Sequence, residues 1–156
     1  MIQKRNGGHG DTHVFSLSPT KLLIAGEGGI VATNNDELAG KIIMGREYGN
    51  SGNYDSAFAG LNARMPEFNA LVGLRSLERL EEAAETRNQA ADMFQELLGV
   101  IPGIGFQVVR AGNRCSYKDF SVTIDPALFG LTRDELALAL QLENIDTRKY
   151  YEPPVH

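Results

Sequence analysis

The residues best suited to do chemistry lie near the beginning of the chain. The run Phe15-Ser16-Leu17-Ser18-Pro19-Thr20-Lys21 places a lysine among hydroxyl side chains, and the run Gly26-Glu27-Gly28-Gly29 follows it. A lysine amine whose pKa is lowered by desolvation or by a nearby cation can attack a carbonyl group. The hydroxyls can donate to a phosphate, and the glycines allow the backbone to approach a ligand closely. These residue types are typical of a lysine nucleophile beside a phosphate site.

A simpler interpretation of the same residues is a hairpin with a surface lysine and turn glycines. The run from Phe15 to Gly29 matches neither the phosphate-loop pattern nor the dinucleotide-binding pattern. From residue types alone the hairpin is therefore the better-supported alternative, and both interpretations stay open.

Two short strands are expected to hold Lys21 between them. Val14–Leu17 and Gly29–Thr33 are apolar runs bounded by Gly, Pro, Ser or Asn, and the second is rich in β-branched residues. The polar side chains of residues 34–36 can then cap a helix. Apolar residues at helical spacing predict that this helix reaches about Arg46.

A long loop and a long helix are expected next. Glu47–Ala63 is rich in glycine and asparagine and has no sustained hydrophobic period, which predicts a loop of the kind that often carries function. Pro66 suits a first helical turn, and apolar residues follow helical spacing from Phe68 to Leu98. One helix over this range would be about 50 Å long. We therefore expect it to link two bodies or to pack on a partner.

The rest of the chain predicts further strands and a helix. Gly105–Arg110 and Tyr117–Ile124 have the composition of strands on either side of a glycine-containing turn. Thr132 can cap a helix that reaches about Glu143. Both strands and helices are expected along the chain, and the predicted fold class is α/β.

Composition excludes several classes of protein. The chain has 156 residues, of which 42% are hydrophobic and 22% charged, as in a soluble globular domain. Its 15 Lys and Arg against 20 Asp and Glu give a net charge of −5, which argues against nucleic-acid binding. No apolar run reaches the roughly 18 residues of a membrane helix. The single cysteine, Cys115, allows no internal disulfide and is expected to be a small core residue. We expect a cytoplasmic protein with no membrane partner and no metal site.

Four blocks of sequence resemble one known family. The runs Phe15–Lys21 and Gly26–Asn35 together resemble the cofactor-lysine segment of the DegT/DnrJ/EryC1/StrS family of pyridoxal-phosphate-dependent nucleotide-sugar aminotransferases. Three further blocks occur in the family's order, namely Gly60–Met65 with Glu67 and Ala70, Leu77–Arg87, and Thr147–His156. Four ordered blocks are far more specific than any one of them, so the chain is identified as a member of this family.

The resemblance implies roles for individual residues. Lys21 is similar to the lysine that forms the internal aldimine with pyridoxal phosphate, and Ser16 is similar to the hydroxyl that contacts the cofactor phosphate. Asn62 matches an asparagine that reaches the phosphate from the neighbouring subunit, which implies a shared site. The residues that match the stretch near the sugar-nucleotide substrate are Arg148, Tyr150, Tyr151 and His156. For the arginine and the tyrosines, a packed C-terminal strand edge is an equally supported alternative.

The resemblance also implies a partial fold-type-I aminotransferase, because family members are well over twice as long as this chain. We expect the phosphate loop, the ring-stacking aromatic and the aspartate that pairs with the ring nitrogen to lie upstream. The last strands and helix of the small domain are expected downstream. Residues 1–50 are then a remnant of the large cofactor-binding domain with the end of its sheet. Residues 51–98 form an interface loop and a long connecting helix, and residues 99–156 an incomplete small α/β C-terminal domain.

The activity that the resemblance implies is transfer of an amino group from an amino acid such as glutamate to a keto-sugar nucleotide, by a homo-oligomer, most simply a dimer. Lysine at position 21 indicates transamination, since dehydratase relatives have histidine there. Without the aspartate that keeps the ring protonated, we expect the chain alone to be inactive. The alternative is a non-catalytic remnant that acts as an assembly or regulatory module.

Overall fold

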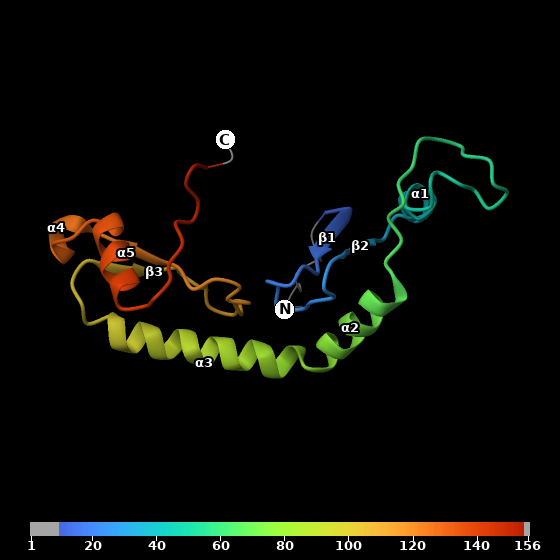
Figure 1. Ribbon diagram of the computed structural model, residues 1–156. Coiled ribbons are helices and arrows are strands. Elements are labelled where there is room, and N and C mark those ends of the chain that lie inside the picture. Colours follow the sequence, from blue (N-terminus) through green and yellow to red (C-terminus); the bar gives the residue numbers. More distant parts are fainter. Residues whose placement is uncertain (1–9, 155–156) are drawn as a thin grey trace. The chain divides into compact units, whose positions relative to one another are not determined.

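The structure is a computed structural model that describes residues 10–154, and it divides into two compact units, Met1–Leu80 and Glu81–His156 (Figure 1). Each unit contains a two-stranded antiparallel sheet together with helices. The boundary lies at the first turn of α3 (Leu80–Leu98). The division of the chain into large-domain, connecting and small-domain parts at residues 50 and 98 remains a prediction.

The first unit begins with a hairpin whose two strands enclose the Lys21 segment. β1 (Thr12–Ser16) pairs antiparallel with β2 (Gly29–Thr33), and Ser16 lies opposite Gly29 at the end that leads into the segment. Both strands occur where β-branched and aromatic residues predict them. The hairpin therefore fixes where the chain leaves β1 and where it returns to β2.

α1 (Asp36–Gly45) follows β2 and begins at the expected cap. The Asn35 side chain accepts a hydrogen bond from the Leu38 backbone N–H at 3.0 Å, which satisfies one of the N–H groups that a helix leaves unpaired at its first turn. Asp36 and Glu37 in that turn complement the positive end of the helix dipole. The predicted helix is confirmed, together with its capping residue.

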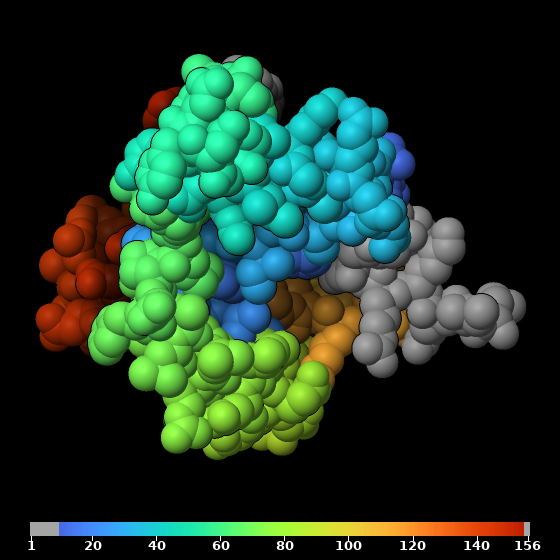
Figure 2. Space-filling model, turned by 90° about the vertical axis from the view of Figure 1, so that its right-hand side faces the viewer, coloured from blue at the N-terminus to red at the C-terminus, as the bar shows by residue number. Residues whose placement is uncertain are grey.

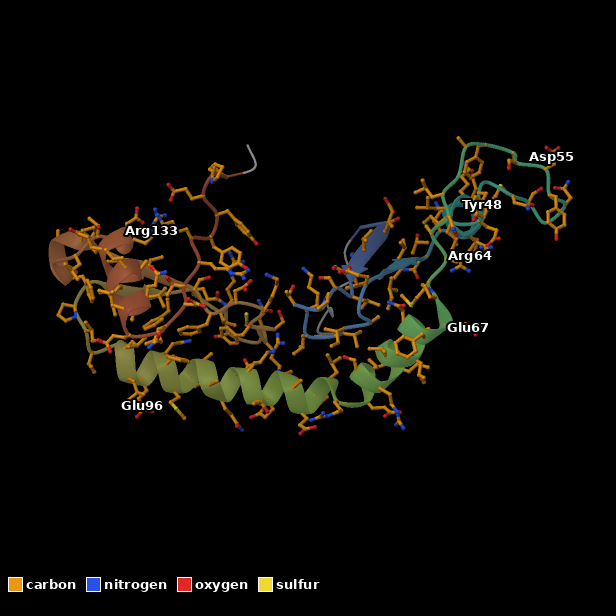
Figure 3. All side chains as sticks on the ribbon, viewed as in Figure 1. Tyr48, Asp55, Arg64, Glu67, Glu96 and Arg133 are labelled. Atoms are coloured by element: carbon orange, nitrogen blue, oxygen red, sulfur yellow. The ribbon has the colours of Figure 1, made fainter. Side chains whose placement is uncertain are left out.

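The segment from Arg46 to Pro66 is a long loop with a narrow neck and a wide tip. Backbone hydrogen bonds from Tyr48 N–H to the Leu61 carbonyl and from Ala63 N–H to the Arg46 carbonyl, each 3.0 Å, join its two limbs. In Figure 3 Tyr48 and Arg64 lie together at the neck, and Asp55 lies far from them at the tip. Figure 2 shows that α1 and this segment, cyan to green, form adjoining surfaces.

Two glycines make this neck possible. A Cβ atom at Gly49 would lie 1.8 Å from the Phe58 carbonyl oxygen, and one at Gly60 would lie 2.0 Å from the Gly49 nitrogen. Gly49 also has a φ of 77°, which side chains disfavour. The backbones of the two limbs can approach this closely because neither residue has a side chain.

The single helix predicted from Pro66 to Leu98 is wrong in one respect, because the structure has two helices here. α2 (Glu67–Glu78) ends at Arg79, where φ is −104° and ψ is 7°, and α3 begins at the next residue. The Arg79 N–H bonds to the Ser76 carbonyl at 3.2 Å, three residues back instead of four, so the last turn of α2 is tightened. The hydrophobic spacing continues through the break and therefore does not reveal it.

The second unit contains α3 and a short hairpin. β3 (Ile104–Phe106) pairs antiparallel with β4 (Val122–Ile124). Both strands are shorter than predicted, and α3 side chains bond carbonyls of the segment between them. Asn88 Nδ2 donates to the Cys115 carbonyl at 3.0 Å, and Arg87 donates to the Tyr117 carbonyl at 3.4 Å. These carbonyls are satisfied without a strand partner.

Two more helices complete this unit. α4 (Pro126–Phe129), which the sequence did not predict, is a single turn capped by Asp125, whose carboxylate accepts from Ala127 N–H at 3.0 Å. α5 (Arg133–Leu142) begins with a reciprocal cap, in which Thr132 and Glu135 each bond the other's backbone N–H. The predicted Thr132 cap is confirmed.

Little apolar surface is buried in either unit. Among residues 10–154 the buried hydrophobic side chains are Leu17, Ala25, Ala84 and Ala91. Many large apolar side chains are exposed to solvent, and Phe68 and Val108 are 75% and 90% exposed. Cys115 is only half-buried, so the expectation that it is a core residue is wrong. Its sulfur accepts a hydrogen bond from Gln107 at 3.1 Å. Within the described part of the chain, no helix is long and apolar enough to span a bilayer.

Replacing Thr132 by alanine tests the cap. We expect Thr132→Ala to destabilise α5 by about 1 kcal/mol, because a first-turn N–H loses its acceptor. Amide hydrogen exchange at Glu135 and Leu136 should accelerate accordingly. Thr147→Ala removes the same atoms outside any helix cap and is the matched control. Unchanged exchange at the start of α5 in Thr132→Ala would show that the cap contributes nothing.

Candidate active site

Lys21 lies in an irregular loop, residues 17–28, that is closed at its base by backbone hydrogen bonds; we call it the Lys21 loop. Leu17 N–H donates to the Gly28 carbonyl at 2.9 Å, and Ala25 N–H donates to the Leu17 carbonyl at 2.8 Å. Leu17 and Ala25 are also the two buried hydrophobic residues in the described part of this unit, at 3% and 0% exposure. The base of the loop is thus the best-packed part of the first unit.

Within the loop, Lys21 is placed by a turn. Its N–H donates to the Ser18 carbonyl at 3.0 Å, and its side chain is half-buried. Among residues 10–154 the structure gives the Lys21 amine no ion pair. A partly buried amine without a carboxylate partner is suited to attack an electrophile once it loses its proton.

The structure brings the hydroxyls of Ser16 and Ser18 together at the end of β1. Ser16 Oγ donates to Ser18 Oγ at 3.4 Å, and Ser18 N–H lies 3.5 Å from Ser16 Oγ. Ser16 is exposed, so its hydroxyl can exchange this long contact for a ligand oxygen. Ser18 thus links the two predicted residues, because its hydroxyl contacts Ser16 and its carbonyl accepts from the Lys21 N–H.

Two side chains of α2 bind the returning limb of the Lys21 loop, and the sequence did not single them out. Asn69 Nδ2 donates to the carbonyls of Ala25 at 2.7 Å and Glu27 at 3.1 Å. Ser76 Oγ accepts from Ile24 N–H at 3.0 Å. The two residues are seven apart, so they lie on one face of the helix.

Asn62 is not joined to the Lys21 loop by any hydrogen bond between described residues. It is exposed and lies in the neck of the long loop, opposite Glu47 in an isolated bridge. Nearby, the Arg64 guanidinium is paired with the Glu47 carboxylate and lies 5.6 Å from the centre of the Tyr48 ring. A role of Asn62 at the phosphate of a second subunit stays a prediction.

In the second unit Tyr150 is held by two charged side chains. Its hydroxyl donates to Asp119 at 3.0 Å and accepts from Lys118 at 3.2 Å, and Lys118 is 2.5 Å from Asp119. Hydrogen bonds to Asp119 first, and then to Tyr150, raise the pKa of Lys118 from 10.5 to about 12. Tyr151 packs edge-on against Tyr150, with ring centres 4.4 Å apart. These contacts fit the alternative in which Tyr150 has a structural role.

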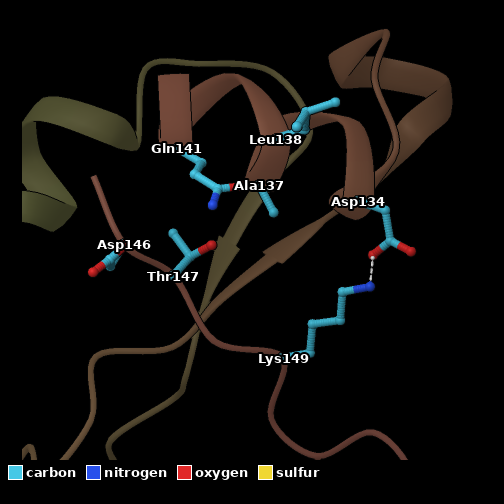
Figure 4. Close-up of a pocket in the computed structure, with 7 residues that line it drawn as sticks. All are labelled: Asp134, Ala137, Leu138, Gln141, Asp146, Thr147 and Lys149. Atoms are coloured by element: carbon cyan, nitrogen blue, oxygen red, sulfur yellow. Dashed lines mark ion pairs between the residues drawn. The ribbon is translucent and has the colours of Figure 1, made fainter. Parts of the chain in front are cut away.

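The remaining predicted substrate residues are not gathered in one site. Arg148 is exposed, and the structure gives it no hydrogen bond or ion pair with another described residue, while His156 lies outside the described residues. A pocket beside α5 contains the neighbouring Lys149, whose amine lies 3.0 Å from Asp134 (Figure 4). Hydrogen bonds from Arg133 first, and then from Lys149, lower the pKa of Asp134. The C-terminal segment is thus tied to α5 by charge.

Comparison with known proteins shows which family this chain belongs to. The model of the DegT/DnrJ/EryC1/StrS aminotransferase family matches residues 1–156. The chain belongs to this family. Its relatives include dTDP-4-amino-4,6-dideoxy-D-glucose transaminase of Shigella dysenteriae, which is 31% identical over 94% of this chain and 40% of its own length. A pleiotropic regulatory protein of Geobacillus stearothermophilus is 30% identical over 94% of this chain and 39% of its own length.

Solved structures support the same fold. The crystal structure of Streptomyces venezuelae DesV in complex with a ketimine intermediate matches with a TM-score of 0.84 and 33% identity, over 96% of this chain and 39% of that one. The chain thus spans about 40% of the length of the relatives it matches. The predicted family and the predicted fold class, a partial α/β aminotransferase, are confirmed.

The Lys118 network yields a prediction about charge. Because the folded pKa of Lys118 is about 12, above its ordinary 10.5, its contribution to stability is complete below pH 10.5 and is lost as the pH rises through 12. We expect Asp119→Asn to bring this pKa down most and Tyr150→Phe to bring it down less. Carbon-13 NMR titration of the lysine side chains measures both shifts.

Asp134→Asn is the matched control, since it removes a carboxylate of the same unit that pairs with Lys149. The Lys118 pKa should be unchanged in this variant. A larger effect of Tyr150→Phe than of Asp119→Asn would contradict the stated order of causes.

Proposed function

We propose that this chain is the lysine-bearing part of a pyridoxal-phosphate-dependent aminotransferase that moves an amino group from an amino acid such as glutamate to a keto-sugar nucleotide. The observation that carries the proposal is the Lys21 loop, in which a half-buried lysine without an ion-pair partner among the described residues is joined by its backbone to Ser18, whose hydroxyl contacts that of Ser16. The transaminase from Shigella dysenteriae supports the substrate class, because its name specifies an amino sugar nucleotide.

The side chains of the loop fit this cofactor. Ser16 offers an exposed hydroxyl to a phosphate oxygen, and the Lys21 amine is suited to bind the aldehyde carbon covalently. Asn62 would add an amide donor to the phosphate from a second subunit. When bound, pyridoxal phosphate supplies an electron sink for the carbon that loses its proton.

In this proposal Lys21 is also the proton carrier of the reaction. Its free Nζ would act as the base that moves a proton between the carbon of the substrate and the carbon of the cofactor. A histidine at this position belongs to the dehydratase relatives, so lysine supports transamination. Arg148, Tyr150, Tyr151 and His156 are proposed to lie near the nucleotide sugar.

The 156-residue chain alone is proposed to turn over little substrate. Strong electrostatic stabilisation of a transition state requires a site that excludes water. In the Lys21 loop, Pro19, Thr20 and residues 26–28 are exposed, so the part of the loop around Lys21 does not exclude water. We propose that the active species is a homo-oligomer, a dimer in the simplest case, in the cytoplasm.

A second function is a non-catalytic assembly or regulatory module. The specific observation in its favour is the similarity to the pleiotropic regulatory protein of Geobacillus stearothermophilus, at 30% identity over 94% of this chain. Selective reaction of Lys21 with the cofactor separates the two functions, because a module without a cofactor site has no reason to favour one lysine.

Trapping with pyridoxal phosphate tests the proposed function directly. After incubation and borohydride reduction, we expect peptide mapping to find the pyridoxyl label enriched on Lys21 over Lys4, Lys41, Lys118 and Lys149. Ser16→Ala should lower this enrichment, because the phosphate loses a donor.

Ser51→Ala, which removes a hydroxyl from the tip of the long loop, is the matched control and should leave the labelling unchanged. Label spread evenly over the lysines would favour the assembly or regulatory module.

We also expect self-association, because α2 exposes apolar side chains that a second copy can cover. Phe68, Leu71 and Leu74 are 75%, 56% and 61% exposed. Sedimentation velocity should show species larger than 17.0 kDa that increase with concentration. Leu74→Gln should weaken the association, whereas Leu128→Gln, at an equally exposed site on α4, should not. A single monomeric species at all concentrations would refute this.

A further inference from the structure

We propose that Asn69 and Ser76 of α2 are positioning residues for Lys21, an inference that rests on the proposed function. Neither residue was assigned a role by sequence, and neither contacts Lys21 itself in the described structure. They act on the backbone that follows Lys21 in the chain, at Ile24, Ala25 and Glu27.

The returning limb of the Lys21 loop depends on these side chains for its hydrogen bonds. Its residues lie in no helix or strand, and among residues 10–154 no backbone group pairs with the Ile24 N–H or with the Ala25 and Glu27 carbonyls. Ile24 is half-buried and Ala25 is buried, so their backbone groups need partners, whereas Glu27 is exposed. Asn69 bonds the Ala25 and Glu27 carbonyls at 2.7 and 3.1 Å, and Ser76 bonds the Ile24 N–H at 3.0 Å.

The face of α2 between these two residues is shaped to let the loop approach. Gly73 lies between Asn69 and Ser76 on the same face, and a Cβ atom there would be 3.4 Å from the Ala25 Cβ. Gly26 has a φ of 79°, and its Cβ position is 3.3 Å from Asn69 Nδ2. The helix backbone can therefore lie close to the loop at Gly73, and the side chains of Asn69 and Ser76 on either side of this glycine bond the loop backbone.

These contacts determine where Lys21 can be. The loop is anchored on one side at Leu17, which is buried at the end of β1, and on the other side at Ile24 and Ala25. Lys21 lies between the two anchors, and its side chain makes no ion pair with a described residue that could fix it instead. Its position relative to Ser16 is consequently set by the backbone, and α2 holds one of the two anchors.

The opposing interpretation is that Asn69 and Ser76 only stabilise the first unit. The two roles predict different reactivities for lysines outside the Lys21 loop when Asn69 or Ser76 is replaced. Loss of stability alone would change the reactivity of all lysines of the unit, Lys41 included. Loss of positioning changes Lys21 while Lys41, on α1, keeps its reactivity. The ratio of label on the two lysines within one molecule therefore separates the roles.

The experiment is pyridoxal phosphate labelling of the 156-residue chain, with borohydride reduction and peptide mapping, in Asn69→Ala, Ser76→Ala and Ser76→Thr. Loss of one hydrogen bond to the loop should lower the Lys21-to-Lys41 label ratio about fivefold in Ser76→Ala, and more in Asn69→Ala, which loses two. Ser76→Thr keeps the hydroxyl and should keep the wild-type ratio. If Asn69→Ala fails to fold, the pair of Ser76 variants decides the question.

Asn88→Ala is the matched control, because Asn88 Nδ2 also donates to two carbonyls, those of Ala84 and Cys115, but in the second unit. Its Lys21-to-Lys41 ratio should equal that of the wild type. A wild-type chain that favours Lys21, together with Ser76→Ala and Asn69→Ala that favour it equally, overturns the positioning role and leaves the proposed function intact. A wild-type chain without any preference for Lys21 overturns both.

Discussion

The backbone of residues 24–27 lies in no strand or helix, so its polar groups must be satisfied from elsewhere, and α2 supplies the partners. The second unit uses the same device, since Arg87 and Asn88 of α3 bond the carbonyls of residues 115–117. In both units a helix holds an irregular segment by side-chain donors and acceptors instead of by a strand ladder. The positions of the Lys21 loop and of the Cys115 segment follow from this one kind of interaction.

Close approach of small residues accompanies these hydrogen bonds. Ala25 meets Gly73 in the first unit, and in the second unit the buried residues of α3 are Ala84 and Ala91, on the face that also carries Asn88. Small side chains bury little area, so packing alone stabilises these contacts weakly. Directional hydrogen bonds therefore determine most of the geometry of these helix–segment contacts. The large apolar side chains are not used in them and remain exposed.

The sequence predicts those features that depend on neighbouring residues. Both strands around Lys21 and the caps at Asn35 and Thr132 were predicted because strand composition and capping are local properties. The break at Arg79 was missed because the apolar spacing is the same on its two sides. Asn69 and Ser76 were missed because their partners lie 44 and 52 residues away, where no local pattern links them.

The long loop has a neck, formed by Gly49 and Gly60, that tolerates no substitution, and a tip that tolerates insertions. At the neck any side chain would collide with the other limb, so these two positions admit no substitution without moving backbone. Beyond it, Tyr54 is 97% exposed, and the turn there is closed by the Asn50 side chain. Doubling the length of such a tip costs only about 0.6 kcal/mol in closure entropy. Insertions at the tip can therefore alter what the loop reaches while the neck, and the helix it adjoins, stay as they are.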